Sequence, residues 1–73
     1  MKTKIDQLIH AHLERFKVYD RPDFPASVRI DIAKEVSSEL YKDIKKLGSG
    51  LTTQMKALDA FNKLCNEVVT GPN

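Results

Sequence analysis

Two helix-breaking stretches constrain the fold of this chain more than any other feature of its sequence. The first is "YDRPDFPAS", where Pro22 and Pro25 exclude regular helix and force the residues before them into extended conformations. The second is Gly48-Ser49-Gly50, a sequence typical of a helix end followed by a short connector. These stretches divide the chain into three segments, and each is long enough for one helix.

Apolar residues recur at three- and four-residue spacing within each segment, which predicts three amphipathic helices and no strand. Thr3 and Asp6 resemble a capping box at the start of the first helix. Asp23 or Ser27 is placed to cap the second helix, and Gly48 to end it in a left-handed conformation. We predict helices over about residues 4–18, 27–47 and 51–69, with a loop over residues 19–26.

The expected fold is therefore all-α, a small three-helix bundle that forms the single domain 1–73. Cys65 is the only cysteine, so no intramolecular disulfide can support the core, and a lone thiol favours a reducing, cytoplasmic location. No apolar run reaches the roughly 18 residues of a membrane span. The basic first residues lack the continuous apolar stretch of a signal peptide.

The apolar faces of the second and third predicted helices are unusually wide. Each covers an arc of about 180°, whereas an ordinary surface helix needs little more than about 100°. The first helix can cover part of this excess. We expect a protein partner or a second copy of the chain to cover the rest, and therefore expect a homodimer.

The motif His10-Ala11-His12 invites a metal-binding interpretation that helix geometry excludes. Residues two apart on a helix point about 200° apart, whereas zinc-binding pairs are three or four apart. His12 falls on the apolar face, either as a buried histidine with hydrogen-bond partners or as a pH-sensitive contact. Cys65 lies on an apolar face and lacks a base or cation beside it in the sequence pattern. We predict neither metal nor cofactor, and no enzyme activity.

Nucleic-acid binding is the alternative interpretation that the lysines support. Basic residues outnumber acidic ones by 12 to 10, a weak excess for a chain that binds nucleic acid through charge. Asp31, Glu35 and Glu39 share the outer face of the second helix with the lysines, and mixed faces are usually solvated. The residues of this alternative site are Lys34, Lys42, Lys45, Lys46, Lys56 and Lys63.

The proline-bearing loop is the favoured recognition site. Exposed aromatic and arginine residues on a stiffened backbone are the side chains from which binding hot spots are made. The opposing interpretation is that Phe24 packs inward and Arg21 pairs with a neighbouring acid. The residues predicted to bind a protein are Tyr19, Arg21, Asp23 and Phe24 in the loop, with Met55 and Leu58 on the third helix.

We therefore expect a small, non-catalytic regulatory protein of the adaptor or inhibitor type, which acts by protein–protein binding. Stand-alone helical chains of this size are common among bacterial and phage regulators, which is an association with size and class rather than with particular residues.

Overall fold

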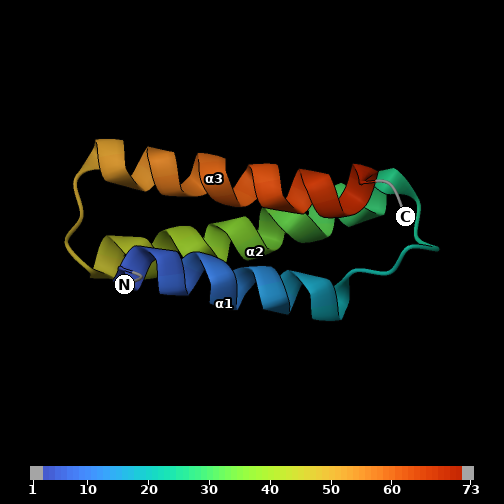
Figure 1. The fold of residues 1–73 in the computed structure, drawn as a ribbon, viewed down its shortest axis with the longest axis horizontal. Coiled ribbons are helices and arrows are strands. Elements are labelled where there is room, and N and C mark those ends of the chain that lie inside the picture. Colours follow the sequence, from blue (N-terminus) through green and yellow to red (C-terminus); the bar gives the residue numbers. More distant parts are fainter. Residues whose placement is uncertain (1–2, 72–73) are drawn as a thin grey trace.

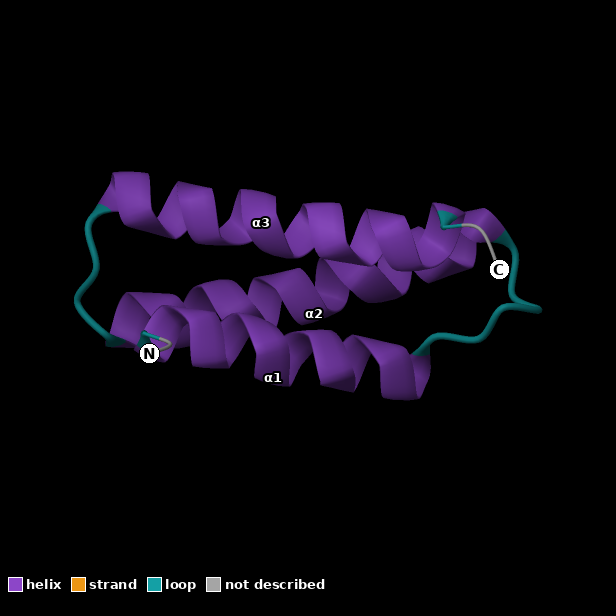
Figure 2. Cartoon of the chain, in the orientation of Figure 1, coloured by secondary structure: helices purple, strands orange, loops and turns teal. Residues whose placement is uncertain are grey.

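The computed structural model describes residues 3–71, and within them it contains three helices and no strand. These are α1 (Lys4–Tyr19), α2 (Ala26–Lys46) and α3 (Leu51–Thr70). Successive helices run in opposite directions, so α1 and α3 are parallel and both contact α2 (Figure 1). The prediction of an all-α, three-helix fold is confirmed. Only two short connections lie outside the helices between α1 and α3 (Figure 2).

The helix ends follow local chemistry, with one exception. Asp6 N–H donates to Thr3 Oγ1 (3.1 Å) and Thr3 N–H donates to Asp6 Oδ2 (3.4 Å), so the predicted capping box is present. Gly48 adopts the predicted left-handed conformation, with φ of 75°. The predicted side-chain cap of the second helix is wrong: Pro25 occupies the N-cap position, and neither Asp23 nor Ser27 caps α2.

The reason lies in Pro25 itself. Its carbonyl oxygen accepts hydrogen bonds from the N–H groups of Val28 (3.0 Å) and Arg29 (3.1 Å), which begins the helix. Its ring fixes φ near the value it has here, −56°, so α2 starts without a capping side chain. The start of α2 therefore depends more on contacts made elsewhere in the fold.

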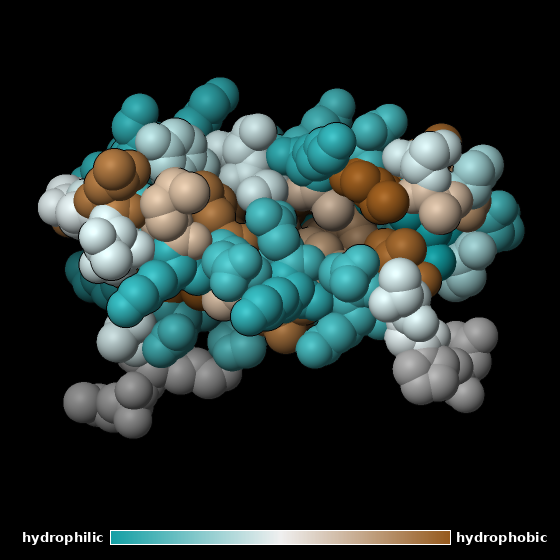
Figure 3. Space-filling model, turned by 90° about the horizontal axis from the view of Figure 1, so that it is seen from above, coloured by the Kyte–Doolittle hydropathy of each residue, from teal (hydrophilic) through white to brown (hydrophobic). Residues whose placement is uncertain are grey.

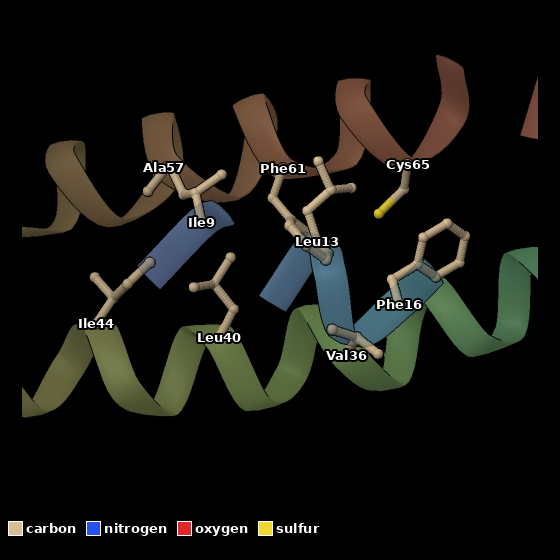
Figure 4. Close-up of a cluster of buried hydrophobic side chains, with 9 residues drawn as sticks. All are labelled: Ile9, Leu13, Phe16, Val36, Leu40, Ile44, Ala57, Phe61 and Cys65. Atoms are coloured by element: carbon tan, nitrogen blue, oxygen red, sulfur yellow. The ribbon is translucent and has the colours of Figure 1, made fainter. Parts of the chain in front are cut away.

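The core is a column of apolar side chains where the three helices meet (Figure 4). Phe16, Leu40, Ile44 and Phe61 are the large side chains with no measurable exposure. Cys65 of α3 and Phe16 of α1 both belong to this cluster (Figure 4). The remaining buried apolar residues are Ile9, Leu13, Val36 and Ala57.

Candidate binding surfaces

A buried ion pair fixes the connection between α1 and α2. Arg29 Nε donates to Asp20 Oδ1 (2.8 Å) and Arg29 Nη2 donates to Asp20 Oδ2 (2.7 Å), a bidentate arrangement. The two side chains are only 12% and 5% exposed. Hydrogen bonding from Arg29 holds the pKa of the Asp20 carboxyl below its ordinary value, against the opposing effect of burial. Asp20 is thus held ionised at the base of the loop.

The same arginine also reaches the end of α3. Its Nη1 donates to the Val69 carbonyl oxygen (3.4 Å), and its Nη2 lies 3.5 Å from that of Val68. These carbonyls belong to the last turns of α3, where the helix dipole favours a cation. One side chain of α2 therefore joins the end of α1 to the end of α3. In the sequence Arg29 is a charged residue within the apolar arc of this helix, and apolar periodicity does not identify its partners.

We call residues 20–25 the anchored loop. Arg21 and Asp23 are exposed on it, and Phe24 is partly buried. Phe24 N–H donates to the Arg21 carbonyl oxygen (3.0 Å), which closes a turn within the loop. Tyr19, predicted in the loop, is instead the last residue of α1 and is 52% exposed. Arg21 forms no side-chain ion pair within residues 3–71.

The structure does not bring all the predicted protein-binding residues together. Met55 is 57% exposed and Leu58 is partly buried, and both lie in the first half of α3. Val69, whose carbonyl oxygen accepts a hydrogen bond from Arg29 near the anchored loop, is 14 residues beyond Met55. At a rise of about 1.5 Å per residue, Met55 lies roughly 20 Å along the helix from the loop. The six residues therefore belong to two separate surfaces.

The second surface is the face of the bundle opposite α1, where α2 and α3 lie side by side. It contains a groove of about 260 Å³ between Ile30 and Ala33 of α2 and Val69 of α3, with Asn62 and Asn66 in its lining. Tyr41 follows Ile30 by three helical turns, and Met55 precedes Asn62 by two, so both continue this surface. We define the α2/α3 face by Ile30, Ala33, Tyr41, Leu51, Met55 and Leu58.

Part of the wide apolar arcs predicted for these helices remains exposed on the α2/α3 face. Ile30 is 45% exposed, Met55 57% and Leu51 68%. Seen from the α3 side, the surface carries apolar patches separated by hydrophilic side chains (Figure 3). Such mixed character is ordinary for an interface between proteins that also exist separately.

The six lysines of the alternative site do not form one patch. Lys34 lines the groove between α2 and α3, whereas Lys56 lines a different groove, between α1 and α3. Lys63 pairs with Asp59 (3.6 Å), and Lys45 lies 5.2 Å from the centre of the Tyr41 ring. Lys42 and Lys46 are exposed on α2. The sequence grouped these residues by helix, but the fold distributes them around the bundle.

The two candidate residues for chemistry are both accounted for by packing. His12 is buried: its Nδ1 lies 2.8 Å from the Leu8 carbonyl oxygen and its Nε2 3.2 Å from Asp43 Oδ2, so both nitrogens have partners. His10 is exposed. Burial, with a smaller contribution from nearby Asp20, raises the pKa of the Cys65 thiol to about 11, which leaves little reactive thiolate near neutral pH.

Two further findings concern residues 3–71 as a whole. No three His, Cys, Asp or Glu side chains gather there in a way that would hold a metal ion. No helix in this part of the chain has the length and apolar character needed to cross a membrane.

Comparison with known proteins gives no relative for this fold: no protein-family model, curated protein or solved structure matches the chain.

Proposed function

We propose that this chain is a small, non-catalytic regulatory protein that binds another protein through the anchored loop. The observation that carries the proposal is the buried Asp20–Arg29 pair, which ties the base of the loop to both neighbouring helices. A loop held in this way keeps its shape before a partner arrives, and less ordering entropy opposes binding.

The side chains displayed on the loop suit this role. Arg21 and Asp23 are exposed and carry opposite charges, and the aromatic residues Tyr19 and Phe24 precede and follow them in the sequence. Arginine and tyrosine are enriched among residues that dominate binding energy. Pro22 and Pro25 stiffen the backbone between them. A partner with a charged rim around an apolar contact would be complementary to this surface.

Two further parts of the proposal concern assembly and location. The exposed apolar side chains of the α2/α3 face support self-association, so we propose that the protein works as a homodimer. The single buried thiol of Cys65 supports a reducing, cytoplasmic location.

The test is a pull-down with the tagged full chain from host lysate, run with and without nuclease and again at high salt. We expect a stoichiometric protein that survives both treatments. It should be lost with the double substitution Arg21→Ala and Asp23→Ala. Lys4→Ala, which removes an exposed cation at the start of α1 and away from the loop, is the matched control and should retain it.

The alternative function, nucleic-acid binding by the lysines, predicts the opposite pattern. Nucleic acid would be retained, lost with salt as counterions compete, and abolished when Lys42, Lys45 and Lys46 are changed to Glu. That result would contradict the proposal. So would capture of a protein that is unaffected by the Arg21 and Asp23 substitutions.

A further inference from the structure

On the α2/α3 face, the edges of the wide apolar arcs of α2 and α3 are exposed next to each other. The exposed side chains of this face come from both helices, Ile30 from α2 and Met55 and Leu51 from α3. With 21 and 20 residues, α2 and α3 are each about 30 Å long, and two helices side by side are about 20 Å wide. That area of about 600 Å² lies at the lower end of the roughly 600–1,000 Å² that a standard interface occupies on each partner.

We infer that a second copy of the chain covers this face, with α2 of each copy packed against α3 of the other in a four-helix core. The inference rests on the homodimer of the proposed function and specifies how it is built. Two-fold symmetry requires a surface that is complementary to itself, so every contact between α2 and α3 occurs twice.

Charge decides which helices meet. Along its outer edge on this face, α2 carries Lys34 and Lys45, whereas the corresponding edge of α3 carries Asp59. The Asp59 carboxylate also lies 3.6 Å from Lys63 Nζ, on the side away from the face. Packing α2 against α2 would bring the two basic edges together and oppose association. Packing α2 against α3 places each basic edge opposite an acidic residue, which fixes the orientation of the pair.

The register follows from the groove within one chain. Ile30 and Val69 line the same groove, and so do Ala33 and Asn66, so the antiparallel offset brings Tyr41 level with Leu58. The Lys45 ammonium lies over the Tyr41 ring, 5.2 Å from its centre, and so is held at that level too. In a dimer whose two-fold axis runs parallel to the helices, this ammonium lies beside Asp59 of the partner copy.

This arrangement has a functional consequence. A two-fold axis parallel to the helices places both anchored loops at the same end of the dimer. Two identical recognition loops on one surface can engage a two-fold symmetric or repetitive partner, and the second contact then forms at a high effective concentration.

The first experiment is equilibrium sedimentation of the full chain over a range of concentrations. We expect twice the mass of the 8.3 kDa chain. Ile30→Glu with Met55→Glu should shift the protein to monomer while circular dichroism shows the helices retained. Val18→Glu is the matched control, since Val18 is 73% exposed on α1, and it should leave the dimer unchanged.

The second experiment is a charge exchange that tests the pairing itself. Lys45→Glu and Asp59→Lys should each weaken self-association by about five- to tenfold, because each creates two like-charge contacts. Mixing the two variants should restore the affinity, since both contacts in the mixed dimer are then between opposite charges. Failure of the mixture to recover would overturn the proposed pairing of α2 with α3.

A wild-type chain that stays monomeric at about 1 mM would overturn the inference as a whole. If this monomer still captured its partner through Arg21, the proposed binding function would stand. A dimer that responds to the charge exchange but captures no protein would support the pairing and contradict the binding function.

Discussion

The two connections of this bundle do the same topological task by different physical means. The α1–α2 connection is fixed by a buried side-chain pair, Asp20 with Arg29, and by that arginine's contacts with the end of α3. The α2–α3 connection relies on backbone conformation, with Gly48 at φ 75° and one hydrogen bond from Gln54 Nε2 to the Ser49 carbonyl oxygen (2.8 Å).

The difference shows that the second connection only links two helices, whereas the first also holds side chains in place for recognition. The second connection uses only residues near it in sequence and displays no group with an evident role in recognition. The first depends on all three helices and carries an exposed arginine, an exposed aspartate and the partly buried ring of Phe24, with Tyr19 beside it at the end of α1. The contacts that stabilise the first connection therefore contribute to folding and also hold its exposed side chains in position.

Breaking the ion pair should have the largest effect. Arg29→Met leaves the largely buried Asp20 carboxylate without its partner, and we expect it to lower the free energy of unfolding more than any other substitution proposed here. A domain of this length has a total of only about 4–11 kcal/mol. Urea unfolding followed by circular dichroism measures the change.

The double variant Asp20→Leu with Arg29→Met is the control for that prediction. It replaces the pair by apolar side chains and should recover most of the loss, since no unpaired charge remains. Equal destabilisation of the single and double variants would show that the pair does not hold the connection.

Acid should weaken the first connection selectively. The pKa of Asp20 is lowered in the native state, so between that value and the ordinary one, about 3.9, the unfolded chain binds more protons. The contribution of the pair is complete above this window and is lost as pH falls through it. Thermal unfolding between pH 5 and pH 2 should therefore show a shallower acid dependence for Asp20→Asn than for the wild type.

Substitutions in the second connection should change the free energy of unfolding by smaller amounts, and in opposite directions at its two glycines. Gly48→Ala places a side chain in the left-handed region and should cost about 1 kcal/mol, although nothing lies within 4 Å of the added carbon. Gly50→Ser should stabilise the protein by about 0.3 kcal/mol, because α3 lacks a capping side chain and glycine is only slightly worse than serine at an N-cap. Chemical denaturation of the two variants side by side gives the comparison.

The smallest effect is expected at an ion pair that resembles the first but is exposed. Arg15 Nη1 lies 3.1 Å from Glu39 Oε2, and each side chain is 47% exposed. Arg15→Ala should therefore change the free energy of unfolding hardly at all, and still less in high salt. A loss comparable with that of Arg29→Met would contradict the view that burial separates the two pairs.

The sequence was sufficient for features that depend on near neighbours. Apolar periodicity predicted three helices, and local chemistry predicted the capping box at Thr3 and the left-handed Gly48. The four-residue spacing of Ile32, Val36, Leu40 and Ile44 is likewise typical of one continuous helix, as α2 is.

Contacts between residues that are distant in the sequence could not be predicted from the sequence. The partners of Arg29 lie nine residues before it and about 40 after it, and His12 meets Asp43 across two helices. A polar residue within an apolar arc signals that a buried partner is needed, but periodicity does not say which acid supplies it. For the same reason the sequence placed Met55 and Leu58 on the third helix without giving their distance from the loop, and the fold places them on another surface.

The most direct test of the account is the mobility of the anchored loop. Backbone ¹⁵N relaxation should give residues 21, 23 and 24 order parameters near 0.85, as for rigid structure, with a clear fall in the Asp20→Asn variant. Order parameters below about 0.6 in the wild type, or no change on substitution, would contradict the claim that the buried pair pre-forms a recognition loop.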